Sequence, residues 1–224
     1  MTPRPAVIVF DVNETLSDMS PLAARFSDLG LPPLLAKVWF ASLLRDGFAL
    51  TAAGGNGAFA EVGAEGLRVL LAGEDLDRDV DAAVGHVMAG FGELSLHPDV
   101  SPGVRTLRAA GLRLVTLSNG STQVADRLFA AAGIRDQFEA LLSVEQAGAW
   151  KPARAVYEHA AASCGVGPAE LLLVAVHPWD IDGAARAGLS TAWIDRAGGR
   201  YPGYFTPPTY TVASLPELST QLTG

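Results

Sequence analysis

The sequence has few of the features that define membrane, secreted or nucleic-acid-binding proteins. Its single cysteine, Cys164, excludes an internal disulfide and fits a reducing cytosol. Acidic residues outnumber basic ones by 24 to 16, so the net charge is −8 and no basic face is expected for nucleic acid or an anionic membrane. No apolar run approaches the roughly 20 residues of a membrane-spanning helix, and no signal peptide is visible. We therefore expect a soluble, cytoplasmic protein.

Short apolar runs recur along the chain at the spacing of a parallel sheet. The first, residues 6–10, is rich in Val and Ile and is typical of a strand buried on both faces. Further strands are predicted at 112–117, 138–142, 171–176, 191–194 and 210–212. Helices are predicted between them at 103–110 (after Ser101 and Pro102 as N-cap and first residue), 121–132, 152–164 and 182–187. This alternation predicts a Rossmann-like, doubly wound α/β fold.

The segment 17–92 has a different pattern, with helical periodicity and no convincing strand. Its predicted helices are residues 21–29, 34–46, 60–71 and 79–91. We therefore expect an α/β core domain of residues 1–16 and 93–224, interrupted by an all-helical cap domain of residues 17–92. An insert after the first strand is expected over the carboxyl ends of the strands, where open α/β sheets bind their ligands.

Polar side chains follow the predicted strands at four places. They are Asp11 to Thr15, Ser118 with Asn119, Lys151 just before a helix, and His177 to Asp180. Because parallel strands end at the same edge of a sheet, these side chains are expected to converge on one pocket. A carboxylate nucleophile, a cation that orients it and donors for a developing oxyanion are the requirements of covalent catalysis.

The segment Phe-Asp-Val-Asn-Glu-Thr-Leu at 10–16 resembles the first motif of the haloacid dehalogenase superfamily, and the resemblance extends over the whole chain. Ser118 matches the second motif, Lys151 the third, and Asp180 lies in the fourth. The helical insert matches a cap placed after the first motif. The resemblance implies that Asp11 is the nucleophile and that Thr15 supports it.

Two positions distinguish the magnesium-dependent phosphatases of that superfamily from its metal-free branch. The phosphatases have a second Asp as general acid and base where this chain has Asn13, and an amide cannot shuttle a proton. They also have a metal-binding Asp where this chain has Val176, which cannot ligate a hard cation. The sequence therefore predicts an enzyme without a metal or other cofactor. Mg²⁺ is expected only under the phosphatase alternative.

The metal-free branch is similar to the type II 2-haloacid dehalogenases, in which an Asp displaces halide from carbon and water hydrolyses the resulting ester. The resemblance implies that Lys151 orients Asp11 and that Asp180 orients Lys151 or activates the water. Thr15, Ser118 and Asn119 are the implied hydrogen-bond donors. The residues predicted to bind the substrate are Asn119, Asn13, His177, Tyr157, Trp39 and Phe40. Four positions depart from the family pattern: Asn13 in place of an aromatic residue, Glu14 in place of Gly, Phe40 in place of a cap Arg and His177 in place of Asn.

The leading prediction is a metal-independent 2-haloacid dehalogenase, a hydrolase that works through an aspartyl ester. Two alternatives remain open at this point: a magnesium-dependent phosphatase acting on a small phosphorylated metabolite, and a non-catalytic relative that binds a ligand. The predicted partner is a small-molecule substrate, with neither nucleic acid nor a membrane. The Trp- and Phe-rich cap also offers a face for a homodimer.

Overall fold

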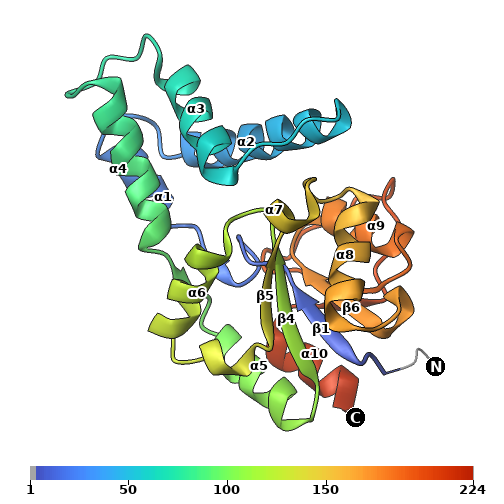
Figure 1. Ribbon diagram of the computed structural model, residues 1–224. Coiled ribbons are helices and arrows are strands. Elements are labelled where there is room, and N and C mark those ends of the chain that lie inside the picture. Colours follow the sequence, from blue (N-terminus) through green and yellow to red (C-terminus); the bar gives the residue numbers. More distant parts are fainter. Residues whose placement is uncertain (1–3, 224) are drawn as a thin grey trace. The chain divides into compact units, whose positions relative to one another are not determined.

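The structure is a computed structural model that describes residues 4–223, and its centre is a six-stranded parallel sheet (Figure 1). The strand order is β5-β4-β1-β6-β7-β8. The strands are β1 (Val7–Phe10), β4 (Arg113–Ser118), β5 (Ala140–Ser143), β6 (Leu171–Ala175), β7 (Ser190–Ile194) and β8 (Tyr210–Val212). Every residue of β1 and β6 is buried, as continuous apolar runs predict for central parallel strands.

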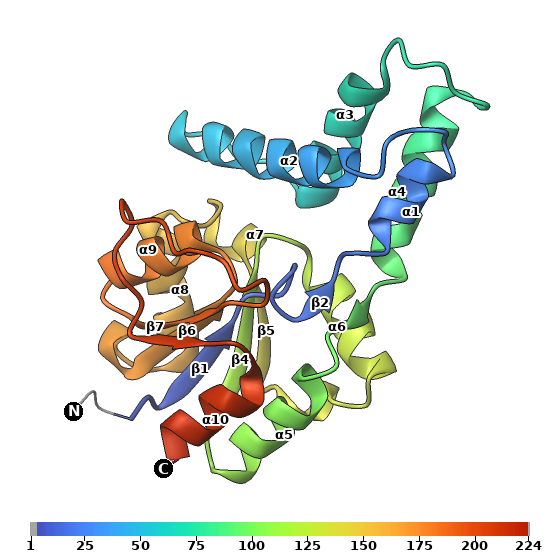
Figure 2. The same cartoon turned by 180° about the vertical axis from the view of Figure 1, so that it is seen from behind.

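Helices cover both faces of this sheet, so the predicted doubly wound α/β core is confirmed. Figures 1 and 2 show α8 on one face and α5 with α10 on the other. The helices of this part are α5 (Val100–Ala109), α6 (Thr122–Ala131), α7 (Val144–Ala147), α8 (Arg154–Cys164), α9 (Pro178–Arg186) and α10 (Leu215–Thr223). Two 3₁₀ turns, Arg135–Gln137 and Pro168–Glu170, complete it. Alternate side chains of the strands, among them Ile8, Phe10 and Leu114, join α5, α6 and α10 in one apolar core.

Two helix starts differ from the sequence prediction. The prediction of Ser101 and Pro102 as N-cap and first residue is wrong, because α5 already begins at Val100 and both lie within its first turn. Proline is tolerated there, since the first-turn N–H groups have no partner within the helix. Helix α9 begins at Pro178 rather than at Asp182. Proline favours this first position, and the earlier start places Asp180 within the first turn.

Residues 18–95 form a separate compact unit of four helices. The helices are α1 (Leu22–Ser27), α2 (Leu35–Ala52), α3 (Phe59–Leu71) and α4 (Val80–Gly92). Helix α2 continues past the predicted end at 46 to Ala52, and Gly47 is buried within it. The chain leaves and re-enters the α/β part through two short paired strands, β2 (Ser17–Asp18) and β3 (Ser95–Leu96). In residues 4–223, no helix has the length and apolarity needed to cross a membrane.

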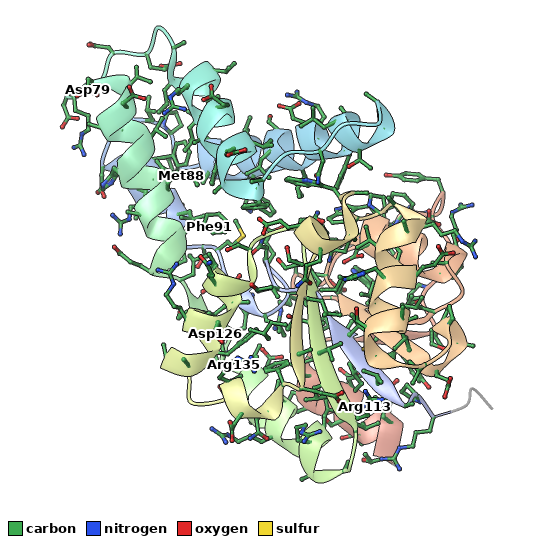
Figure 3. All side chains as sticks on the ribbon, in the orientation of Figure 1. Asp79, Met88, Phe91, Arg113, Asp126 and Arg135 are labelled. Carbon is green, nitrogen blue, oxygen red and sulfur yellow. The ribbon has the colours of Figure 1, made fainter. Side chains whose placement is uncertain are left out.

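The interior of the helical unit is aromatic. Trp39 lies 5.9 Å from Phe91 and 6.3 Å from Phe26, measured between ring centroids. The indole N–H of Trp39 donates to the carbonyl oxygen of Gly63 at 2.9 Å, which satisfies its one polar group. Figure 3 labels Phe91 on α4, from which its ring reaches this cluster. Phe40 is also buried and lies 6.5 Å from Phe59.

We predict that Gly103→Ala destabilises the α/β part. A Cβ at Gly103 would lie 2.4 Å from the Cβ of Leu215, where α5 packs against α10. Such overpacking lowers the free energy of unfolding by roughly 1–3 kcal/mol. The matched control is Gly85→Ala on α4, where a Cβ meets nothing within 4 Å. That change should be neutral or should stabilise by up to about 1 kcal/mol. Urea denaturation followed by circular dichroism measures both, and equal effects would contradict the packing argument.

Candidate active site

Three adjacent strands bring the predicted site residues to one edge of the sheet. Phe10 of β1 is in register with Thr116 of β4 and Val174 of β6. Asp11 directly follows β1, and its backbone N–H donates to the carbonyl oxygen of Val174 at 3.0 Å. Ser118 is the last residue of β4, and His177 follows the end of β6 by two residues. The carboxyl edge of the sheet therefore carries the polar residues that the sequence places after each strand.

Lys151 lies at the centre of this group with no exposed side-chain surface. Its Nζ is 2.8 Å from Oδ1 of Asp11 and 2.6 Å from Oδ2 of Asp180. Its backbone N–H donates to Oδ1 of Asn119 at 3.0 Å, which holds the segment before α8 against the loop after β4. A buried ammonium is tolerated only with such partners, because removing it from water costs several kcal/mol.

Asp180 is fully buried, and both of its carboxylate oxygens are engaged. Oδ2 faces Lys151, and Oδ1 accepts a hydrogen bond of 2.6 Å from the hydroxyl of Tyr157. Burial raises the pKa of Tyr157 well above its ordinary value, and the Asp180 charge adds to this, so the hydroxyl stays a donor. Gly183 makes the close approach of α8 to α9 possible, since a Cβ there would lie 2.7 Å from the Tyr157 hydroxyl oxygen.

Electrostatics keep Asp11 ionised. Burial alone would raise the pKa of its carboxyl, but the charge of Lys151 and the hydrogen bond from His177 hold that pKa well below its usual range. Burial likewise lowers the pKa of Lys151, and the charges of Asp11 and Asp180 more than offset this. The result is a buried carboxylate beside a buried ammonium, the ionisation state that a carboxylate nucleophile requires.

The second oxygen of Asp11 has different partners. The hydroxyl of Thr15 donates to Oδ2 at 2.5 Å, and the same hydroxyl accepts the backbone N–H of Val176 at 3.1 Å. Nδ1 of His177 lies 3.2 Å from this Oδ2, and Nε2 of the same ring lies 2.8 Å from Oε2 of Glu14. Burial lowers the pKa of His177, but these hydrogen bonds and charges raise it to about 9. At neutral pH the ring is therefore an imidazolium between two carboxylates.

Glu14 adopts a left-handed backbone conformation, with φ of 60°. It is the one non-glycine residue of positive φ in the described part of the chain. This conformation costs roughly 1–2 kcal/mol for a residue with a side chain. Its carbonyl oxygen lies 3.0 Å from Nε2 of His97, and the next carbonyl, that of Thr15, accepts two hydrogen bonds from the guanidinium of Arg196 at 2.8 and 3.2 Å. The sequence places Glu14 in the first polar segment but predicts no role for it, and the sequence prediction did not include His97 or Arg196 in the site.

The other predicted residues lie in two groups. Ser118 accepts the backbone N–H of Gly120 at 2.9 Å, and the buried Asn13 lies beside the same glycine. Trp39 and Phe40 lie in the aromatic core of the helical unit, and the contacts found for them are those of core side chains. Their participation in substrate binding stays a prediction, as does that of Asn13 and Tyr157.

The side chains at the carboxyl edge of the sheet do not form a binding site for a hard cation. Within residues 4–223, no three His, Cys, Asp or Glu side chains gather as a metal ion requires. The space between the carboxylates of Asp11 and Asp180 is filled by the Lys151 ammonium. Val176, at the position of the phosphatases' metal ligand, contributes its backbone N–H to Thr15.

A doubly wound sheet, a helical insert after the first strand and an ionised carboxylate held by a lysine together define a class of α/β proteins built for covalent catalysis. Residues 5–188 match the model of the haloacid dehalogenase-like hydrolases. The chain belongs to this family.

Several known proteins are similar to this chain, each over a different share of its length. The (S)-2-haloacid dehalogenase of Pseudomonas sp. (strain YL) is 36% identical over 141 residues, which are 62% of this chain and 61% of that enzyme. The (S)-2-haloacid dehalogenase H-109 of Pseudomonas putida is 27% identical over 214 residues, 95% of each chain. The structure of L-2-haloacid dehalogenase from Xanthobacter autotrophicus with chloropropionic acid covalently bound has a TM-score of 0.88 at 25% identity, covering 98% of this chain and 99% of that one. This chain thus spans about six-tenths of the first relative and nearly all of the other two.

We predict that Lys151→Met destabilises the protein by roughly 3–5 kcal/mol, because it leaves two buried carboxylates without their cation. Without the ammonium the pKa values of these carboxyls rise, so the deficit should shrink as the pH falls from 7 to 5 and a proton neutralises one of them. The control is Lys37→Met, which changes the other lysine of the chain, an exposed one. Urea unfolding at both pH values tests this, and a pH-independent deficit would contradict it.

We also predict that the His177 ring titrates near pH 9 and that Asp11→Asn lowers this pKa, because the amide removes one of its two anionic partners. A pKa raised by folding contributes stability that is complete below about pH 6.5 and is lost as the pH rises through the folded value. NMR titration of the ring protons measures the pKa directly. The chain has four histidines, and His177→Asn identifies the relevant signal. An unchanged pKa in Asp11→Asn would refute the coupling.

Proposed function

We propose that this protein hydrolyses the carbon–halogen bond of a small 2-haloacid through an ester on Asp11, without a metal ion. The observation that carries the proposal is the buried Asp11 carboxylate, held ionised by the Lys151 ammonium 2.8 Å away. The names of the relatives add support, since each is a 2-haloacid dehalogenase. The single cysteine, buried and free, is compatible with work in a reducing cytoplasm.

In the first half-reaction an oxygen of Asp11 attacks the halogen-bearing carbon of the substrate. A carbon–oxygen bond forms, the carbon–halogen bond breaks, and the halide leaves with the bonding electrons. Burial favours this step because few water molecules solvate a carboxylate with 5% of its side chain exposed. The covalently bound chloropropionic acid of the Xanthobacter relative supports a covalent intermediate for this chain as well.

In the second half-reaction water attacks the ester carbon, which is Cγ of Asp11. The bond to the substrate oxygen breaks, the 2-hydroxy acid leaves, and the Asp11 carboxyl is restored. Negative charge develops on the ester carbonyl oxygen during the attack. The Lys151 ammonium and the Thr15 hydroxyl already point at the two Asp11 oxygens and supply the donors that this charge needs.

The charge arrangement favours this chemistry over the magnesium-dependent alternative. The cation between the two carboxylates is an ammonium that belongs to the protein. Asn13 cannot act as the acid and base of phosphoryl transfer, and Val176 offers no carboxylate. The residues at the sheet edge therefore support displacement at carbon by Asp11.

The test is halide release from chloro-, bromo- and fluoroacetate and the 2-halopropionates, measured with and without EDTA. We expect turnover that is insensitive to EDTA and that falls by at least about 10³-fold in Asp11→Asn. Asp136→Asn, an exposed position on the same α/β part, is the matched control and should keep its activity. Magnesium-dependent phosphate release from an aryl phosphate, without halide release, would overturn the proposal. Silence in both assays would favour a binding role.

A further inference from the structure

The hydrolytic water must lose a proton to some group beside the ester, and Asp180 is poorly placed for this. Its two oxygens are occupied by Lys151 at 2.6 Å and Tyr157 at 2.6 Å, and its side chain has no exposed surface. Burial and the nearby charge of Asp11 raise the pKa of Asp180, but a proton on its carboxylate would weaken both contacts and leave the buried ammonium with one charged partner fewer. The base is therefore to be sought on the other side of Asp11.

His177 occupies that side. Its Nδ1 is 3.2 Å from Oδ2 of Asp11, so the ring lies beside the carbon that the water attacks. Its side chain keeps 12% exposure, which Asp180 lacks. The ring stacks on Trp179 with 4.9 Å between centroids, which fixes its plane. A base must lie within hydrogen-bond reach of the water it deprotonates, and this ring is in place to do so.

We propose that His177 is the base that deprotonates the hydrolytic water, and that Glu14 is the positioning residue that holds its ring. The inference rests on the proposed function and deepens it. Oε2 of Glu14 lies 2.8 Å from Nε2 of the ring, so the carboxylate holds a proton on that nitrogen and directs Nδ1 toward Asp11. The Glu14 side chain is 40% exposed, which gives the pair contact with solvent.

Ester formation itself makes His177 a base. Asp11 and Glu14 are among the charged groups that face the ring, and Lys151 lies behind Asp11. While Asp11 is an anion, the ring stays protonated and cannot accept a proton. Esterification removes the charge of Asp11, so the ring loses one of the two anions that hold its proton. The ring becomes a base after the first half-reaction, when one is needed.

The protons balance over the whole cycle. After halide departure the imidazolium releases one proton to solvent, the proton that accompanies the halide in the overall reaction. Neutral His177 then takes a proton from the attacking water and passes it to the departing alkoxide, which leaves as the 2-hydroxy acid. The other proton of that water is left on the restored Asp11 carboxyl and moves to His177. The ring is then an imidazolium beside a carboxylate, as at the start.

The conformation of Glu14 fits this role. The strained backbone at φ of 60° turns its carboxylate toward His177, and His97 and the Arg196 guanidinium hold the carbonyl groups of Glu14 and Thr15. The same short loop supplies Thr15 to one side of Asp11 and Glu14 to the far side of His177. Both half-reactions thus depend on the segment of Glu14 and Thr15, whose carbonyl groups are held by hydrogen bonds.

The experiment separates the two half-reactions. His177→Gln, Glu14→Gln, Asp180→Asn and wild type are mixed with 2-bromopropionate, and bromide release and intact protein mass are followed together. We expect His177→Gln, which differs from the Asn of the family pattern, to release about one bromide per protein and then nearly stop, with the ester mass retained on the peptide that contains Asp11. Its steady-state turnover should fall by about 10²–10⁴-fold. Glu14→Gln should retain the ester in part, with turnover about tenfold lower. Glu158→Gln, an exposed change on α8, is the control.

Each outcome is informative. A variant damaged only in its structure would release bromide slowly and would retain no ester. That result in both the His177 and the Glu14 variants would overturn the inference. Ester retention in Asp180→Asn but not in His177→Gln would assign the base to Asp180. Absence of halide release by the wild type, for every acid of the panel, would instead remove the proposed function on which the inference rests.

Discussion

The Lys151 ammonium between two buried carboxylates is the interaction on which the rest of the site depends. A fully buried lysine is unfavourable unless its charge is paired, so Asp11 and Asp180 must both reach it. One of these follows β1 and the other lies in the first turn of α9. The pairing therefore fixes the segment before α8 against two further elements. Tyr157 and Asn119 complete it by satisfying Asp180 and the Lys151 backbone.

The two oxygens of Asp11 have separate environments, and this asymmetry organises the chemistry. Oδ1 faces a permanent cation, which keeps the carboxyl ionised for attack. Oδ2 faces a hydroxyl and an imidazole whose charge depends on that of Asp11. The fixed charge of Lys151 suits the displacement of halide. The charge of His177, which depends on that of Asp11, suits the hydrolysis that follows. One carboxylate can serve two steps because its two sides differ.

Much of this arrangement follows from the sequence, and the exceptions have physical causes. The run at 6–10 and the polar residues after each strand predict the parallel sheet and the gathering of Asp11, Lys151 and Asp180, because parallel strands end at one edge. Arg196 carries no comparable signal: it binds the backbone carbonyl of Thr15, 181 positions away, and any residue type offers such a carbonyl. The pattern of Trp39 and Phe40 is that of a helix face, which is the same for a core and for a pocket wall.

Glu14 shows why local preference fails at the site. Judged by backbone preference alone, a residue with φ of 60° should be glycine, and a side chain there costs roughly 1–2 kcal/mol. The structure offsets this with the hydrogen bonds of His97 and Arg196 to the loop and with the contact between the Glu14 carboxylate and His177. Glycine would relax the backbone but would leave Nε2 of an imidazolium without its anionic partner. Glu14, whose backbone is strained, is also the residue whose carboxylate reaches the His177 ring, so the strain lies in the loop that carries the chemistry.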